Sequence, residues 1–155
     1  MCYNIVVVLI KFMSEVYLLL HIVLAIVLGS VLGWQRTHFG KSAGLRTFAL
    51  VTAGATLFTI LSMRAFGTNT TAVASGIVTG IGFLGAGTIL HKENRVEGLT
   101  TAAGLWMAAA IGMAVGVGYY LLSIATTIIV LILLMIDDSN FKKSEEAQKL
   151  SVKNR

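Results

Sequence analysis

The stretch Gly76-Ile-Val-Thr-Gly-Ile-Gly-Phe-Leu-Gly-Ala-Gly-Thr-Ile-Leu-His91 decides the fold that we expect for this chain. It is apolar enough to cross a bilayer, yet five of its sixteen residues are glycine. In hydrocarbon, small residues let two helix backbones approach closely. We therefore predict that this stretch is the buried centre of a bundle of transmembrane helices, and that its glycines serve helix packing: Gly76, Gly80, Gly82, Gly85 and Gly87.

The composition agrees with a membrane location. The chain has 155 residues, is 56% hydrophobic and has a mean hydropathy of +0.85, which is far above the usual soluble range. The net charge of +5 would also suit a nucleic-acid partner, but a spanning protein collects Lys and Arg in its cytoplasmic loops. We therefore predict a lipid environment and no nucleic acid. The single cysteine, Cys2, excludes an internal disulfide framework.

Five transmembrane spans are expected. The run Leu99–Ile136 has 38 residues without a charge, and as one helix it would be about 57 Å long against a hydrocarbon core of about 30 Å. We divide it at Gly116-Val-Gly-Tyr-Tyr120, where glycine permits a tight turn and tyrosine suits the interface. The prediction is an all-α membrane domain over 14–136, preceded by an N-terminal segment, 1–13, and followed by a charged cytoplasmic tail, 137–155; the spans are 14–33, 43–63, 71–90, 99–115 and 119–136.

The distribution of positive charge predicts the orientation. Five spans place the two termini on opposite sides, and ten of the twelve Lys and Arg lie in the segments 34–46 and 91–98 and in the tail. Cytoplasmic loops carry the excess of Lys and Arg. The N-terminus is therefore expected outside and the C-terminus on the cytoplasmic side of the membrane. Lys11 follows the apolar start of the chain, so no removable signal peptide is expected.

Other small residues suggest further helix contacts and a repeat. Gly29 and Gly33 are four residues apart, as are Gly112 and Gly116, and both pairs are predicted to pack against neighbouring helices. The segment Gly44-Leu-Arg-Thr-Phe-Ala49 recurs 54 residues later as Gly98-Leu-Thr-Thr-Ala-Ala103. This pattern would make two parallel span–loop–span units, and with so few identities a true duplication and a chance match stay equally open.

The residues predict neither an enzyme nor a metal or cofactor site. Gly80-Ile-Gly82-Phe-Leu-Gly85 matches the dinucleotide-binding pattern, but that motif needs a preceding strand and a following amphipathic helix. None of the seven acidic residues lies at mid-membrane depth, which disfavours a dedicated Mg²⁺ pore because Mg²⁺ prefers hard oxygen ligands. No serine, cysteine or lysine stands in a nucleophile motif with a base.

Two groups of polar residues are candidate sites. His21 lies well inside a span, where it is either a proton relay or metal ligand, or a neutral imidazole bonded to a neighbouring helix; we favour the second interpretation. A basic cytoplasmic rim is expected to set the topology and contact anionic lipid, with a specific anion or partner site as the alternative. The rim comprises Arg36, Arg46, Thr47, Lys92, Arg95, Thr100 and Thr101.

Three ordered motifs resemble the signature of the MgtC/SapB family: Ala43-Gly-Leu-Arg-Thr47, Gly80-Ile-Gly-Phe-Leu-Gly-Ala-Gly-Thr-Ile-Leu90, and Val96-Glu-Gly-Leu-Thr-Thr-Ala-Ala103 with Leu105-Trp106. The resemblance covers about residues 14–136. It implies a compact bundle of about five spans in a prokaryotic cytoplasmic (inner) membrane. It also implies a role in magnesium homeostasis and virulence, and action on other membrane proteins, such as the ATP synthase, without carriage of Mg²⁺.

The chain departs from the family pattern in three places. Gln35 stands where the family usually has a glutamate that would pair with Arg36 or Arg46. The Asp and Arg that commonly precede the third span are absent from 67–72, and the soluble C-terminal domain of longer members does not follow the fifth span.

These observations predict a non-enzymatic membrane protein that modulates a membrane partner under low magnesium, acid or host stress. One alternative is a small ion or anionic-solute transporter or channel with Arg46 and His21 at its pathway. Another is a lipid-binding or structural membrane protein. Homo-oligomerisation is left open.

Overall fold

A computed structural model describes the backbone of residues 2–65, 70–92 and 95–153, and the side chains of 13–65, 70–91 and 96–136. In these ranges the chain forms five helices and one two-stranded hairpin, which confirms the predicted all-α membrane bundle. The elements are α1 (Cys2–His38), α2 (Leu45–Ala65), α3 (Thr70–Ala86), β1 (Leu90–Lys92), β2 (Arg95–Glu97), α4 (Leu99–Val117) and α5 (Tyr120–Lys153).

Three of these helices contain a segment long and apolar enough to cross a membrane: Met13–His38, Leu45–Ala65 and Leu99–Val117. Two shorter apolar helical segments, Thr70–Ala86 and Tyr120–Ile136, accompany them. The long uncharged run is interrupted at Gly118, whose φ of 94° caps α4 in the left-handed region that glycine adopts at little cost. The break therefore falls inside the segment where the sequence predicted it.

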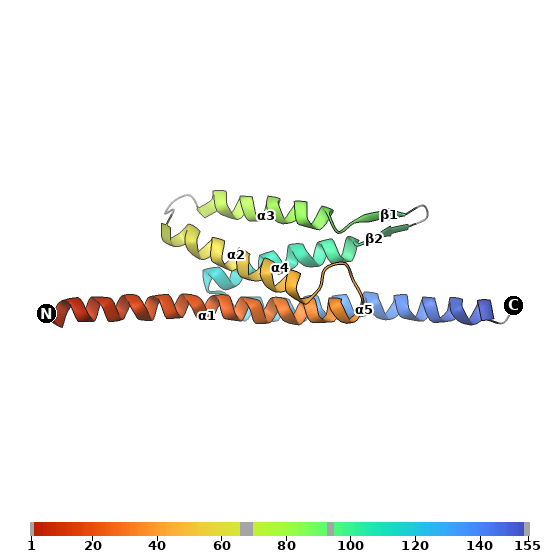
Figure 1. Ribbon diagram of the computed structural model, residues 1–155, viewed down its shortest axis with the longest axis horizontal. Coiled ribbons are helices and arrows are strands. Elements are labelled where there is room, and N and C mark those ends of the chain that lie inside the picture. The colour runs from red at the N-terminus through yellow and green to blue at the C-terminus, as the bar shows by residue number, and fades with distance from the viewer. Residues whose placement is uncertain (1, 66–69, 93–94, 154–155) are drawn as a thin grey trace.

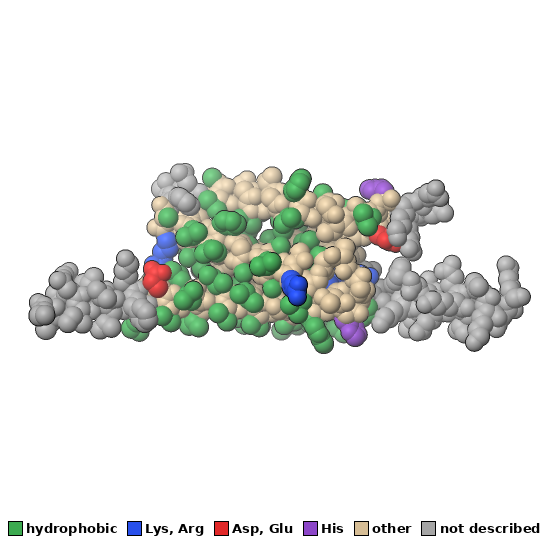
Figure 2. Space-filling view, viewed as in Figure 1, with side chains coloured by type: hydrophobic (Ala, Val, Ile, Leu, Met, Phe, Trp, Pro, Cys, Tyr) green, Lys and Arg blue, Asp and Glu red, His purple; other side chains and the backbone are tan. Residues whose placement is uncertain are grey.

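The helices form layers (Figure 1). α1 and α5 lie along one side, α3 lies on the opposite side, and α2 and α4 lie between them. α1 begins and α5 ends at opposite ends of the bundle. The core is built where α1, α2 and α4 meet, around Leu32, Phe48, Leu105, Ile111 and Val115. Figure 2 shows hydrophobic side chains spread over the visible flank and acidic side chains only near its ends, as expected for a surface that faces lipid.

Four glycines bring α1 and α4 close to α2. A Cβ added to Gly29 or Gly33 would come within 2.7 Å of α2 backbone atoms, and one added to Gly116 would lie 2.9 Å from the Thr56 carbonyl oxygen. A Cβ on Gly112 would collide with the backbone at Thr52. Real Cβ contacts are longer than these distances. The α1–α2 and α4–α2 pairs therefore approach each other at these positions to distances that only glycine permits.

The prediction that Gly76–His91 forms the buried centre is wrong. α3 lies at the outside of the bundle, and its buried residues are Ile81 and Gly85. A Cβ added to Gly76, Gly80 or Gly82 would meet no atom of another described segment within 4 Å. The central helix is α4, which has nine buried residues.

The two remaining glycines of this stretch differ from each other. A Cβ on Gly85 would make ordinary contact with Ala102 of α4 at 3.5 Å, so this glycine does lie in a helix interface. Gly87 is exposed and follows the end of α3, and an added Cβ would meet carbonyl oxygens of its own turn. Of these two glycines, only Gly85 contributes to the contact between α3 and α4.

The charged loop expected at 91–98 contains a short antiparallel hairpin. Leu90 pairs with Glu97 and His91 with Val96, and Gly98 leads into α4 with a φ of 91°. A Cβ at Gly98 would also collide with the Thr88 carbonyl. The tight joint between hairpin and α4 therefore requires glycine.

Candidate functional site

Only part of the predicted basic rim comes together. Arg36 is 1% exposed, and its Nη2 donates a hydrogen bond to Thr101 Oγ1 at 3.3 Å, which joins α1 to α4. The guanidinium is thus inside the bundle near the C-terminal end of α1 and is not on a rim. A buried arginine needs hydrogen-bond acceptors in place of water, and the Thr101 hydroxyl supplies one.

The other predicted rim residues belong to α2, to the hairpin and to α4. Arg46 and Thr47 are exposed at the start of α2, and Thr100 is half-buried in the first turn of α4. Lys92 and Arg95 are paired in the hairpin, and their side chains lie outside the described residues. Of the seven predicted rim residues, Arg36 and Thr101 are thus joined directly by a hydrogen bond between described side chains.

Gln35, where the family usually has glutamate, has a specific contact. It is 5% exposed, and its Nε2 donates to the Leu134 carbonyl oxygen of α5 at 3.3 Å. An ionised carboxylate has no hydrogen to donate to a carbonyl. The amide can therefore tie α1 to α5 at a position where a charged glutamate could not make the same bond. The sequence marked Gln35 only as a departure and gave no signal of its partner.

His21 belongs to a hydrogen-bonded chain of three residues. It is 6% exposed; its Nδ1 lies 2.8 Å from the Tyr17 carbonyl oxygen, and its Nε2 lies 2.6 Å from the Tyr120 hydroxyl. The hydroxyls of Tyr120 and Tyr17 are 2.7 Å apart. Tyr120 begins α5, so the imidazole is bonded to a neighbouring helix, which is the arrangement of the favoured interpretation.

Sequence reasoning missed the two tyrosines as members of this chain. Tyr17 was not singled out, although its spacing of four residues from His21 places both on one face of a helix. Tyr120 was interpreted only as an interfacial aromatic residue. Nothing local in the sequence indicates that α5 returns to α1 at this level.

A polar pocket of about 220 Å³ adjoins this chain at the end of the bundle where α2 and α4 end and α5 begins. Arg64 forms part of its wall and donates a hydrogen bond from Nη1 to Ser14 Oγ at 3.3 Å. Four helices contribute to the lining, which consists of Tyr17, Leu18, His21, Ile60, Met63, Arg64, Gly116, Val117, Gly118 and Tyr120.

Arg46 and His21 lie at different depths of the bundle. Gly33 of α1 contacts Leu45 at the start of α2, and His21 precedes Gly33 by twelve residues. At 1.5 Å per residue, this separation is about 18 Å along the helix axis. The two residues therefore lie toward opposite ends of the bundle. Among the described residues, no three or more His, Cys, Asp or Glu form a group that could hold a metal ion.

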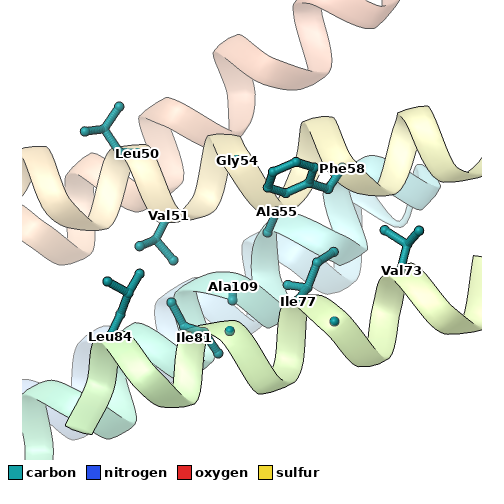
Figure 3. A pocket seen from close by; sticks show the side chains of 12 residues that line it. Leu50, Val51, Gly54, Ala55, Phe58, Val73, Ile77, Ile81, Leu84 and Ala109 are labelled. Atoms are coloured by element: carbon teal, nitrogen blue, oxygen red, sulfur yellow. The ribbon is translucent and has the colours of Figure 1, made fainter. Parts of the chain in front are cut away.

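An apolar groove of about 620 Å³ runs between α2 and α3 (Figure 3). Its walls carry large side chains from both helices, including Val51 and Phe58 of α2 and Ile77 and Leu84 of α3, while Ala109 of α4 lies behind them. Three glycines also line it: Gly54, Gly76 and Gly80. Two exposed glycines of α3, Gly76 and Gly80, thus face a groove and not the packed core.

The fold and these sites define a polytopic helical membrane protein with no soluble domain among its described residues. A model of the MgtC family matches residues 22–141, and the chain belongs to that family.

Named relatives agree with this assignment. The putative magnesium transporter YhiD of Escherichia coli K12 is 39% identical over 127 residues, which are 76% of this chain and 59% of the relative. Protein MgtC of Salmonella typhimurium is 40% identical over 133 residues, or 86% of this chain and 55% of the relative. This chain thus matches between half and three-fifths of the length of these proteins. No solved structure matches it.

Proposed function

We propose that this protein is non-enzymatic and that it binds another integral membrane protein, such as ATP synthase or a transporter, and modulates it during adaptation to low magnesium, acid or host stress. Family membership supports the magnesium connection, since relatives are named MgtC and putative magnesium transporter. The observation that carries the proposal is the open groove between α2 and α3.

The groove has the properties of a surface that receives a transmembrane helix. It is lined almost wholly by apolar groups, so a hydrophobic helix can occupy it without leaving polar groups unsatisfied. Gly76 and Gly80 form a small-residue pair on one wall, and Gly54 lies on the other. Where no side chain intervenes, the backbone of an incoming helix can approach closely. The occupant that we propose is therefore a helix of the partner.

Two leucine substitutions on the same helix test this assignment. Gly80 and Gly82 are both exposed, and an added Cβ at either meets no other described segment within 4 Å, but only Gly80 lines the groove. Gly80→Leu should fill the groove while the bundle stays folded, and Gly82→Leu is its matched control. The photo-crosslinking amino acid p-benzoylphenylalanine at Phe58, a groove residue, reports occupancy in growing cells.

The expected result is a discrete membrane-protein adduct from position 58 that persists in Gly82→Leu and disappears in Gly80→Leu. Growth in low magnesium, in cells that lack their own family member, should follow the same pattern. An adduct that survives Gly80→Leu, or no adduct together with normal growth of both variants, would refute the groove as the docking surface. An adduct between two copies of this chain would instead identify a homo-oligomer.

A small ion or anionic-solute transporter is the second candidate. The name of the Escherichia coli relative and the polar pocket beside His21 favour it. Proteoliposomes loaded with indicators for Mg²⁺, protons or organic anions test this function directly. Flux that depends on this protein and is lost in His21→Ala would support transport, whereas no flux above that of empty liposomes would remove it. The orientation with the N-terminus outside remains a prediction that labelling of Cys2 from either side can check.

A further inference from the structure

We propose that the pocket beside His21 binds a phosphate group that carries a primary ammonium group a few bonds away, as in the headgroup of phosphatidylethanolamine or in free phosphoethanolamine. This pocket has no lining residue in common with the groove between α2 and α3, and the proposal does not depend on the docking of a partner helix.

The direction of the hydrogen bonds determines which kind of ligand group can bind beside Tyr17. The Tyr17 carbonyl oxygen can only accept, so His21 Nδ1 carries the proton that bridges their 2.8 Å separation. In a neutral imidazole, Nε2 is then an acceptor, and the Tyr120 hydroxyl donates to it. The Tyr120 oxygen in turn accepts from the Tyr17 hydroxyl. The chain is thus oriented from Tyr17 toward His21.

The outer end of this chain is an acceptor. Tyr17 is 53% exposed and lines the pocket, and because its hydrogen is engaged by Tyr120, its oxygen offers lone pairs to a ligand. The C-terminal end of α4, at Gly116–Gly118, lines the same pocket and contributes the negative end of a helix dipole. A group that binds here should carry hydrogen-bond donors and positive charge.

Arg64 supplies hydrogen-bond donors and a positive charge on another wall of the pocket. Its guanidinium has five N–H donors, and one of them is used in the hydrogen bond to Ser14 Oγ. A phosphate oxygen is a strong partner for such a donor group. A pocket with a guanidinium on one wall and tyrosine oxygens on another is therefore complementary to a zwitterion and not to a simple anion.

The size and position of the pocket agree with a headgroup. A volume of 220 Å³, at about 30 Å³ for each water, equals about seven waters, which is enough for a phosphate and a short amine. The pocket lies where α2 ends at Ala65, α4 ends at Val117 and α5 begins at Tyr120. Tyrosines are typical of the membrane interface, the depth at which headgroups lie.

Two lipids with the same acyl chains provide the test. The full chain in detergent micelles is titrated with short-chain phosphatidylethanolamine or phosphatidylcholine, and bound lipid is counted by native mass spectrometry. The choline nitrogen has no N–H, so it cannot donate to Tyr17. We expect about fivefold to tenfold tighter binding of phosphatidylethanolamine, the effect of about one hydrogen bond.

The variants separate the two halves of the site. Tyr17→Phe should abolish the preference for the ethanolamine lipid by lowering its affinity to that of phosphatidylcholine. Arg64→Gln should weaken both lipids about tenfold, the effect of one charge-assisted hydrogen bond. Tyr119→Phe is the control, because Tyr119 is 63% exposed and does not line the pocket. Unchanged circular dichroism shows that each variant is folded.

Equal affinity for the two lipids, a preference for phosphatidylcholine, or a preference that survives Tyr17→Phe would each overturn the proposal. Free phosphoethanolamine forms the last arm. Its failure to displace the ethanolamine lipid supports a lipid ligand, and displacement that is lost in both Tyr17→Phe and Arg64→Gln supports a soluble ligand at the same site.

Discussion

The two interfaces of α2 use glycine in opposite ways. Toward α4, Gly112 and Gly116 are pressed against the α2 backbone so closely that an added Cβ would collide. Toward α3, Gly76 and Gly80 line an open groove in which an added Cβ would meet no other described segment within 4 Å. A glycine in an apolar helix therefore does not by itself indicate where the helix packs.

The facing surface of α2 explains the difference. Toward α4 it presents small or compact groups such as Ala55 and Thr56, and the Thr56 hydroxyl donates to carbonyl oxygens that include that of Gly112, at 2.7 Å. Toward α3 it presents larger side chains such as Val51 and Phe58, which line the groove (Figure 3). Compact side chains on α2 let α4 come close, whereas larger ones line the groove toward α3.

The largest expected loss of stability comes from adding a side chain at the close contact between α4 and α2. Gly112→Leu should destabilise the bundle by more than about 3 kcal/mol, because the new side chain has to displace the α2 backbone at Thr52 and the Cβ of Ala55. Reversible unfolding in mixed micelles measures the loss. Gly82→Leu is the control on α3 and should retain parent stability. Equal stability of the two variants would contradict the distinction between a closed and an open interface.

The sequence predicted the elements of this fold better than their arrangement. The length of the uncharged run Leu99–Ile136 predicted a break between two helices, and the structure has this break at Gly118. The apolar composition of the segments predicted the five helices. The position of α3 was wrong because glycine content reports how closely a helix can be approached, not which neighbour approaches it. That choice depends on the side chains of α2, which lie some twenty to thirty residues away in the chain.

The candidate sites show the same limit. Basic residues near the ends of spans predicted a rim, but one of them, Arg36, is directed into the bundle, where Thr101 of α4 accepts its hydrogen bond. His21 was found from the sequence because a titratable group inside a span is unusual. Its partner Tyr120 is 99 residues away, and such a contact has no local signature.

The next largest loss of stability should come from removing the hydrogen bond between Arg36 of α1 and Thr101 of α4. Thr101→Val keeps the side-chain volume and removes the hydroxyl that accepts from Arg36. A hydrogen bond to a charged group contributes about 1.5–3 kcal/mol, so the free energy of unfolding should fall by that amount. Thr47→Val, at an exposed position, should change it far less. Equal effects would show that the buried contact adds no stability.

The smallest expected changes in the free energy of unfolding come from adding one methyl group on α3, at the groove, or on α4, at its close contact with α2. Gly80→Ala should raise the free energy of unfolding by about 0.4–1 kcal/mol, because alanine restricts the unfolded chain and the open groove accepts its Cβ. Gly112→Ala should lower it, since the same methyl group would collide with the backbone at Thr52. Opposite signs in parallel unfolding titrations are the expected result. A loss of stability in Gly80→Ala would mean that α3 closes onto α2 in the membrane, and the groove would then not be open to a partner helix.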